Sequence, residues 1–573
     1  MKSVASSSGL LIALLAACGG TAAPASSSPP AAASGSAAAK ASPAASATPK
    51  RGGTVKVGIW QEPAMLNPIL NTQTITSIVA YAMLDGLAPA QPDGTYGPGL
   101  ATQVPTKENG GVSADGLTVT YKLKSGVLWS DGQPFTGKDV AFTYKVIMNN
   151  ANPVINRTGY TDIDSVTTPD DSTVVVKFKK LYAGYRGLFD WILPEHAFNG
   201  DSNIDKKEYN RAPIGTGPFV LKEWKSGDTI TLVRNEKYRE QGKPYLDGLI
   251  FKVMPSREAE IQAYKVGDID VMWNMLEANI PDVDKIPDSL SEPAPGSEVE
   301  RLVLNTSCPS GPQQGDPKCP HPILGDPKVR QAIELAIDKK AIVDKLLFGK
   351  TTVASSVIPL GWYAPKLNPS EFNLAKAKQL LDEAGWKPGA DGVRVKDGVR
   401  AHLTFSTTTG DQLREQTQQV IQEMLKGVGI ELEIKNQPSP VLLGSWAEGA
   451  PRAKGNFDII MYTTNADLDP QAHLANYFGG DQVPSEQTKS GRNYHRIIDP
   501  ELDKALNTAS STLDESARKD AYKTVAERIA EDRGHIVLYN RLRIDPHKTY
   551  VNGVRTNVWK YLGWDTENWW LSK

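Results

Sequence analysis

The sequence predicts a mixed α/β fold divided into more than one lobe. The chain has 573 residues, well above the roughly 250–300 at which a single hydrophobic core stops growing. Segments that alternate polar and apolar residues, as half-buried strands do, are interspersed with amphipathic segments flanked by helix-capping residues. Hydrophobic residues make up 40% and charged residues 22% of the chain, proportions typical of soluble globular proteins rather than of disordered or membrane-embedded ones.

The N-terminus has the pattern of a lipoprotein signal peptide. Lys2 is followed by an apolar run over residues 10–17, which is too short for a membrane-spanning helix of about 20 residues. Leu15–Cys18 (LAAC) resembles the bacterial lipobox, whose cysteine is acylated and becomes the new N-terminus. We therefore predict a signal peptide over residues 1–17 and a lipid anchor on Cys18 that holds the exported protein at the outer face of the cytoplasmic membrane. The alternative is an ordinary cleavage site with an incidental cysteine.

Residues 18–50 are predicted to form a disordered tether. Beyond Cys18 the segment consists almost only of Ala, Ser, Pro, Gly and Thr, which cannot bury enough apolar surface to offset the chain entropy lost on folding. A flexible linker of this length would let the folded body reach away from the membrane.

The folded body is predicted to begin near Gly52 with a strand. The alternating segments expected to form strands are 54–59, 118–123, 174–178, 229–233, 403–406 and 430–434. The amphipathic stretch 413–425 lies between the last two strands. We expect this strand–helix–strand unit to be right-handed and to place its strands in a parallel sheet.

Two further helices are marked by capping residues. Asp326 is positioned to cap a helix that runs from Pro327 to Ile337, with Gly349 shortly after its end. Asn373 and Gly385 bracket a shorter helix in the same manner.

The remaining cysteines, Cys308 and Cys319, lie in a loop rich in Pro and Gly. In the oxidising exterior of a cell, two such thiols are expected to form a disulfide. The alternative is a metal site that also uses His321, although no CxxC pair accompanies these residues.

Composition and motifs exclude several classes of function. Lys and Arg total 63 against 65 for Asp and Glu, so the net charge of −2 offers no broad positive field to a nucleic acid. The chain contains no GxSxG, HExxH or Walker sequence, and Gly215-Thr216-Gly217 lacks the third glycine of a dinucleotide fingerprint. The seven histidines are scattered, without the spacing of a metal site. We therefore predict a protein that is not an enzyme and needs no cofactor or metal; a secreted hydrolase would require a nucleophile–base pair that no motif indicates.

Several segments, in order along the chain, resemble one family. Residues 117–147 (LTVTYKLKSGVLWSDGQPFTGKDVAFTYKVI) contain an extended segment, a Lys-x-Gly turn, an Asp-Gly turn and a helix that opens with Asp-Val. This pattern is similar to the signature of the extracytoplasmic solute-binding proteins of the peptide/nickel class of ABC importers. The other matching stretches are 213–219 (PIGTGPF), 235–238, 329–338, 377–386, 458–470 and 499–503.

The resemblance implies a periplasmic-binding-protein-like, two-lobed "Venus flytrap" with an extra domain inserted in lobe one. Lobe one would comprise residues 51–90, 211–300 and 537–573, the extra domain 91–210, and lobe two 301–536. The connections near Glu300–Asn305 and Ile536–Arg541 would form a hinge that closes around a ligand.

The resemblance also implies a ligand site. Peptide-binding relatives hold the ligand's α-ammonium with an Asp that follows a Trp in the segment corresponding to Tyr462–Pro470. Asp467 is the candidate for that role and Asp469 is its rival, because Thr464 replaces the Trp and the spacing to Pro470 is one residue short. Tyr462 and Thr464 are assigned to the same site. The alternative for either Asp is a turn or a helix cap.

Three tryptophans occupy positions where relatives line the cleft. Trp60 follows the first strand, Trp362 lies in a Pro-Leu-Gly-Trp loop, and Trp446 precedes the Asp-containing segment. Each could contact ligand side chains, or could instead serve interdomain packing.

The predicted function is that of the substrate-binding component of an ABC importer. Hinge closure would capture a peptide, and the closed form, expected to be monomeric, would deliver it to the membrane permease. Alternatives are the same role with a sugar, opine, haem or nickel chelate, since the fold does not fix the substrate, and a sensing or adhesion lipoprotein that feeds no transporter.

Overall fold

A computed structural model describes residues 48–71, 73–154, 157–444, 446, 448–489 and 491–573 of the chain. Residues Pro49–Lys573 form one compact unit. The predicted signal peptide, Cys18 and nearly all of the tether lie outside the described residues. Among the residues that are described, none of the helices is both long enough and apolar enough to cross a bilayer.

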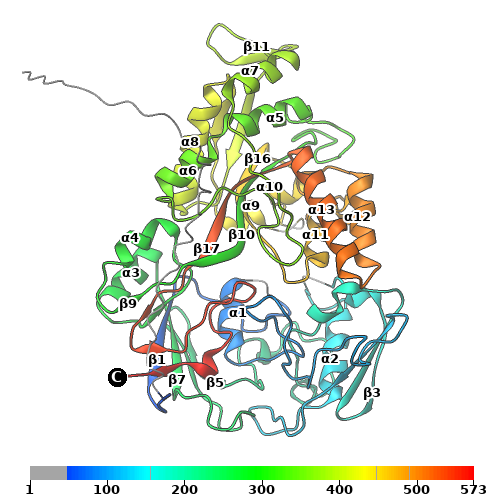
Figure 1. Cartoon of the computed structure of the whole chain (residues 1–573), viewed down its shortest axis with the longest axis vertical. Helices are drawn as coiled ribbons and strands as arrows, with labels where there is room; N and C mark the ends of the chain where they lie inside the picture. Colours follow the sequence, from blue (N-terminus) through cyan, green and yellow to red (C-terminus); the bar gives the residue numbers. More distant parts are fainter. Residues whose placement is uncertain (1–47, 72, 155–156, 445, 447, 490) are drawn as a thin grey trace, which may run out of the picture. The chain divides into compact units, whose positions relative to one another are not determined.

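A seven-stranded sheet in the order β5-β6-β7-β1-β8-β18-β9 contains the first strand of the body (Figure 1). β1 pairs in parallel with β7 and β8. The buried side chains of β1 pack against α1 in one apolar cluster. The bounds are β1 Thr54–Ile59, β5 Phe219–Lys225, β6 Thr229–Arg234, β7 Gly248–Val253, β8 Val271–Met272, β9 Ser289–Leu290, β18 His547–Lys548, α1 Thr74–Tyr81, α3 Arg257–Lys265 and α4 Ile280–Val283.

A five-stranded sheet has the order β15-β14-β16-β10-β17. Its strands are β10 Ala294–Leu304, β14 His402–Ser406, β15 Glu431–Ile434, β16 Ile459–Asn465 and β17 His535–Arg543. Alternate residues of β10 enter different cores, because successive strand side chains point to opposite faces. Leu302 and Leu304 join the cluster of α5–α8, whereas Val299 and Val303 join those of α9–α13.

Helices therefore cover both faces of the five-stranded sheet, with α6 and α8 on one side and α12 and α13 on the other (Figure 1). On the first face lie α5 Pro327–Ala336, α6 Lys339–Leu346, α7 Leu374–Glu383 and α8 Gln412–Lys426. On the second lie α9 Ser439–Leu443, α10 Pro451–Lys454, α11 Gln471–Phe478, α12 Pro500–Ser510 and α13 Glu515–Asp532.

A third sheet, β2-β4-β3, packs against α2. Thr136 and Asp139 form a capping box at the start of α2, which explains the Asp-Val at this point of the sequence signature. The bounds are β2 Thr118–Lys122, β3 Ile163–Asp170, β4 Thr173–Phe178 and α2 Gly137–Met148. Smaller sheets contain β11 Lys387–Pro388, β12 Arg394–Lys396 and β13 Val399–Arg400, and β19 Val551–Asn552 and β20 Trp570–Leu571. The 3-10 helices are η1 Tyr160–Asp162, η2 Ala183–Gly187, η3 His196–Phe198, η4 Glu208–Asn210, η5 Glu277–Asn279, η6 Gly480–Gln482 and η7 Thr566–Asn568.

Each of the six predicted strands is present, and β14 and β15, joined by α8, are parallel as predicted. The helix predicted from Pro327 to Ile337, with Gly349 after it, is wrong at its end. It stops at Ala336, and Asp338 starts a second helix, α6, because its side chain accepts a hydrogen bond from the Ala341 amide at 2.9 Å. Gly349 follows this second helix.

The glycines of the Pro213–Phe219 segment permit a close backbone approach. A Cβ atom on Gly215 would lie 1.9 Å from the carbonyl oxygen of Met83, and one on Gly217 would lie 2.6 Å from the Met83 carbonyl carbon. Both positions therefore exclude any side chain.

The two segments predicted as hinges are neighbours in one sheet. β10 and β17 pair antiparallel, with Glu300 opposite Tyr539 and Arg301 opposite Val537. The strands of the seven-stranded sheet all come from the segments assigned to lobe one, and those of the β2-β4-β3 sheet come from the segment 91–210. The lobe boundaries themselves stay a prediction.

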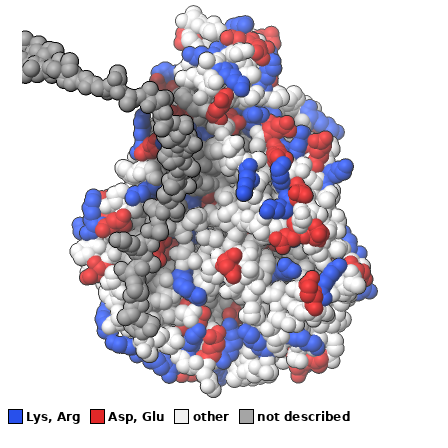
Figure 2. Space-filling model, viewed as in Figure 1, with Lys and Arg blue, Asp and Glu red and all other residues white. Residues whose placement is uncertain are grey.

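Charged side chains are mixed over the visible face of the molecule. Figure 2 shows Lys and Arg interspersed with Asp and Glu, without a large area of one sign on that face, in keeping with the net charge of −2.

Candidate functional site

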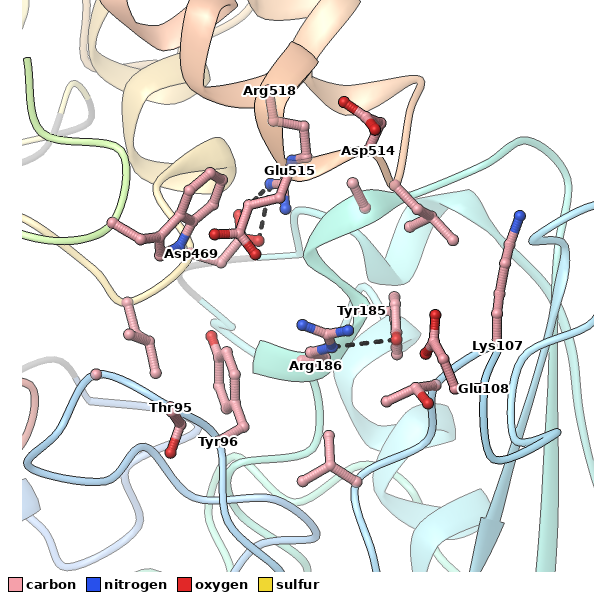
Figure 3. Close-up of a pocket in the computed structure, with 17 residues that line it drawn as sticks. Thr95, Tyr96, Lys107, Glu108, Tyr185, Arg186, Asp469, Asp514, Glu515 and Arg518 are labelled. Atoms are coloured by element: carbon pink, nitrogen blue, oxygen red, sulfur yellow. Dashed lines mark hydrogen bonds and ion pairs between the residues drawn. The ribbon is translucent and has the colours of Figure 1, made fainter.

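Two adjoining cavities lie where the segment 91–210 faces α13 and the residues that follow β16. Their volumes are about 710 and 220 Å³. Tyr96, Leu468 and Asp469 line both, and we call the two cavities together the cleft. Figure 3 shows the larger one, with Asp469 and Arg518 on one side and Tyr96 and Arg186 on the other.

The Asp469 carboxylate is already neutralised by protein groups. Its two oxygens accept hydrogen bonds from Nη2 of Arg518 at 2.9 and 2.8 Å, as the dashed lines of Figure 3 mark. Oδ1 also accepts from the Gln471 amide at 3.1 Å, in the turn that starts α11. The same Arg518 nitrogen donates to the Tyr522 hydroxyl at 2.8 Å. Asp469 therefore belongs to a structural ion pair at the edge of the cleft.

The Asp467 carboxylate has no such partner. It lines the smaller cavity, and among the described residues none donates a hydrogen bond to it or forms an ion pair with it. The hydroxyl of Tyr363 bonds to its backbone oxygen instead. The surrounding protein displaces much of the carboxylate's hydration although the side chain remains accessible from the cavity. This desolvation, followed by the negative charge of Asp469, raises the pKa of Asp467 to about 6.

The other charged groups of the smaller cavity are paired. Nζ of Lys560 lies 2.9 Å from Oδ1 of Asp190, and both residues line the cavity. Tyr160 and Tyr182 add aromatic surface to its wall. In the smaller cavity, the unpaired carboxylate of Asp467 therefore lies among aromatic side chains.

Thr464 and Tyr462 lie behind the cleft rather than in its lining. Thr464 is buried, and its hydroxyl is 3.0 Å from Nε2 of His473. Burial, and then the nearby Arg301, lower the pKa of His473 to about 3, so the imidazole is neutral. Tyr462 is buried with the guanidinium groups of Arg301 and Arg452 each 5.2 Å from its ring centroid.

Of the three predicted tryptophans, only Trp362 lines the cleft, with Arg518 5.3 Å from its ring centroid. Trp446 is buried, and Nζ of Lys454 lies 3.8 Å from the centroid of its ring. Trp60 lines a different cavity and stacks on Trp273. The structure thus brings Trp362 alone of the three into the lining of the cleft. The ring of Trp60 is engaged by Trp273, far away in the sequence, and that of Trp446 by the nearby Lys454. A ligand contact of Trp60 or Trp446 stays a prediction.

Several cleft residues escaped the sequence reasoning. Arg518, Tyr96 and Lys560 lie far from the Asp-containing segment along the chain, and no motif marks them. Arg518 is a helical arginine 49 residues beyond Asp469, so only the fold brings the two together.

Cys308 and Cys319 form a disulfide, with Cα atoms 5.4 Å apart. His321, the third residue of the alternative metal site, is engaged elsewhere: Nε2 lies 2.9 Å from Asp458, and Nδ1 accepts from the Ile323 and Leu324 amides at 3.0 Å. These residues therefore support the loop that leads into α5.

Comparisons with known proteins agree with the fold. The family described as "Bacterial extracellular solute-binding proteins, family 5 Middle" matches residues 95–485. Among curated proteins, the chain is 30% identical over 536 residues to the oligopeptide-binding protein AppA of Bacillus subtilis, covering 91% of this chain and 92% of that one. It is 28% identical over 485 residues to the nickel-binding periplasmic protein of Escherichia coli, covering 82% and 85%.

Solved structures show the same architecture. Bacillus subtilis AppA in complex with a nonapeptide superposes with a TM-score of 0.77 at 28% identity, covering 92% of this chain and all of that one. NikZ of Campylobacter jejuni in complex with Ni(L-His) gives a TM-score of 0.77 at 24% identity, covering 90% and 99%.

These matches define the class as solute-binding proteins with a periplasmic-binding-protein fold, as predicted. The chain belongs to the bacterial extracellular solute-binding proteins of family 5, a family of binding proteins rather than enzymes.

Proposed function

We propose that the protein captures peptides in the cleft and delivers them to the permease of an ABC importer. The observation that carries this proposal is the Asp467 carboxylate, which faces a cavity without a partner while its neighbour Asp469 is neutralised by Arg518. A peptide's α-ammonium is the cation that would complete the site. The name of the Bacillus relative and its complex with a nonapeptide support the choice of ligand.

The energetics favour a cationic ligand end. A charge-assisted hydrogen bond between a carboxylate and an ammonium contributes about 1.5–3 kcal/mol. The ammonium would also favour the ionised form of a carboxyl group whose pKa lies near 6, and so lower that pKa. Trp362 and Tyr96 supply flat surfaces for side chains further along the peptide.

Closure of the lobes about β10 and β17 would enclose the peptide, and the closed form would be recognised by the permease. In this proposal the lobes follow the boundaries predicted above. The protein acts as a monomer held at the membrane surface by lipid on Cys18. The Ala/Ser/Pro-rich tether gives it freedom to reach the permease.

The test is calorimetry on the body that starts at Pro49. A free pentapeptide should bind, and the same peptide acetylated at its N-terminus should bind at least about tenfold more weakly, because the charge-assisted bond is lost. Asp467→Asn should abolish this distinction between the two peptides. Glu515→Gln, at another acidic residue of the cleft lining, should leave it unchanged. If nickel chelates or sugars bind and peptides do not, the fold assignment stands and the proposal that peptides are the substrate is wrong.

A further inference from the structure

A cavity of about 220 Å³ lies at the β17 end of the five-stranded sheet, and we call it the edge cavity. All of its lining residues fall between positions 334 and 537. β17 is the last strand of its sheet, and the chain before Ser355 runs beside it, with Val353 bridged to Tyr539. From Ser355 to Val357 the same chain lines the edge cavity, together with His535 and Val537 of β17.

The edge cavity is separate from the cleft, because it shares no lining residue with either of the cleft's two cavities. Helix α13 reaches both places. Arg518, in its first turns, lines the cleft, and Arg533, directly after its last residue, lines the edge cavity. These two residues are 15 positions apart, which corresponds to about 22 Å along a helix. A molecule in the edge cavity would therefore not compete with a ligand in the cleft.

The charged groups of the edge cavity are two cations and one carboxylate. Oε1 of Glu334 lies 3.1 Å from Nζ of Lys339, and Oε2 lies 3.1 Å from Nε of Arg533. His535 is neutral, because burial and then the charge of Arg301 lower its pKa well below the usual value. The edge cavity therefore carries one positive charge in excess. Lys339 is buried, and its desolvation lowers the pKa of the ammonium, so a further anion would favour its charged form.

Polar hydrogens are left over on the same wall. Nζ of Lys339 donates to Glu334 and, at 2.6 Å, to the hydroxyl oxygen of Ser370, which leaves its third N–H. The hydroxyl oxygen of Ser356 accepts from the Ile358 amide at 3.0 Å. In the part of the chain that the structure describes, no acceptor takes the hydroxyl hydrogen of Ser356 or Ser370. An oxyanion could accept from the ammonium and from both hydroxyls.

The rest of the wall includes apolar side chains. Val357, Ile529 and Val537 are buried and line the edge cavity. A volume of about 220 Å³ is far larger than the roughly 10–15 Å³ that one water molecule requires. The space can therefore hold a chain of a few carbon atoms beside these residues while the polar end of the same molecule lies at Lys339.

We propose that the edge cavity binds a short aliphatic monocarboxylate. Its carboxylate accepts from Lys339, Ser356 and Ser370, and its alkyl chain lies against Ile529 and Val537. One negative charge cancels the excess of one positive charge, whereas a dianion would leave an unmatched charge next to apolar side chains. The site does not depend on the proposed peptide function.

The test is calorimetry with sodium butyrate, and with butyramide as its neutral match, on the compact unit that starts at Pro49. Sodium chloride at equal ionic strength is the reference. Butyrate should bind and butyramide should not. Lys339→Met should weaken butyrate binding about tenfold to a hundredfold, the loss expected for a charge-assisted hydrogen bond. Lys340→Met removes the same charge from the exposed neighbouring residue, which pairs with Asp344, and should leave the affinity unchanged.

Ala530→Trp gives a second readout that spares the buried charges. Ala530 is an exposed residue of α13 that lines the edge cavity, so a tryptophan there should obstruct the space and abolish butyrate binding. Thr524→Trp, at an exposed position of the same helix outside the lining, should not. Peptide binding in the cleft should be equal in all four variants.

Ala530→Trp decides the matter if Lys339→Met fails to unfold cooperatively. The proposal is overturned if butyrate does not bind the wild type, or if butyramide binds equally well. It is also overturned if a folded Lys339→Met variant or Ala530→Trp keeps the wild-type affinity, or if Lys340→Met or Thr524→Trp loses it.

Discussion

Asp467 and Asp469 lie two residues apart, yet their carboxylates meet different surroundings. Asp469 is held by both contacts to Arg518, whereas Asp467 faces a cavity and gains a pKa of about 6 from desolvation and from Asp469. A binding protein benefits from this arrangement, because the unpaired carboxylate offers its full interaction to the ligand and the paired one keeps the loop in place.

The first prediction concerns the pH dependence of peptide affinity. The ligand's ammonium needs the ionised carboxylate, and the ionised fraction of Asp467 falls as the pH falls through about 6. At pH 5 about one carboxyl group in ten is ionised, so affinity should be about tenfold lower than at pH 7.5. Calorimetry across this range measures the change. The Asp467→Asn variant should show a flat profile, and a wild-type profile equally flat would contradict the assignment.

The same residue should oppose folding at neutral pH. A carboxyl group whose pKa is raised in the folded state binds its proton more tightly there than in the unfolded chain, so its contribution to stability falls between its unfolded pKa and about 6. Asp467→Asn should therefore have a higher Tm than the wild type at pH 7.5, and the difference should vanish at pH 3.5. A variant that is less stable at pH 7.5 would show that Asp467 has a stabilising partner.

At this scale the sequence located the Asp-containing segment but could not choose between its two carboxylates. The choice depends on Arg518, which lies 49 residues further on and pairs with Asp469, whereas Asp467 faces the smaller cavity without such a partner. Local patterns contain neither fact.

Individual elements were predictable where their signals are local. Alternation located six of the strands, and Asp326 and Asn373 cap their helices through their own side chains, as predicted. The end of α5 was missed because no Gly or Pro stands between Ala336 and Asp338. The pairing of β10 with β17 joins residues more than 230 positions apart, which no local pattern specifies.

The two strands predicted to form the hinge, β10 and β17, are connected by a buried chain of ion pairs. Glu300 on β10 contacts Arg541 on β17 at 3.4 Å and Arg414 on α8 at 3.0 Å, and Arg541 contacts Glu277 at 2.9 Å. Glu300 and Glu277 are fully buried, so their charges depend on these partners.

Removing the central carboxylate should be costly. Glu300→Gln should lower the free energy of unfolding by about 3–5 kcal/mol, because it leaves Arg414 and Arg541 buried with less compensation. Urea unfolding measures the change. Glu527→Gln, in an exposed pair with Lys523 on α13, should change the stability by less than about 0.5 kcal/mol. Equal effects of the two variants would show that burial does not determine how much these ion pairs contribute to stability.

The disulfide is a covalent link within the segment predicted to form lobe two. It joins residues 11 positions apart, and a loop of about a dozen residues corresponds to a stabilisation of about 3 kcal/mol in the chain-entropy model. Replacing both Cys308 and Cys319 by Ser should lower the stability by that order. Reduction should destabilise the wild type to a similar degree and leave the double variant unchanged. A wild type insensitive to reduction would argue against a structural role.

The whole molecule draws its two large sheets from segments that are interleaved along the chain. The seven-stranded sheet includes a strand that ends before residue 60 and another that begins after residue 546. All strands of the five-stranded sheet lie between these two strands in the sequence. Only β10 and β17 include the points where the chain passes from one predicted lobe to the other. This topology allows the lobes to move about two adjacent strands while each sheet keeps its own core.

Ligand binding should therefore change the shape of the body without changing its secondary structure. Small-angle scattering of the protein that starts at Pro49 should show a smaller radius of gyration with saturating peptide, because the ligand contacts both walls of the cleft and favours the closed form. Asp467→Asn at the same peptide concentration should scatter like the unliganded protein, and circular dichroism should be equal in all samples. If the wild type binds peptide by calorimetry and its scattering does not change, the cleft is already closed before the ligand arrives, and β10 and β17 do not act as a hinge.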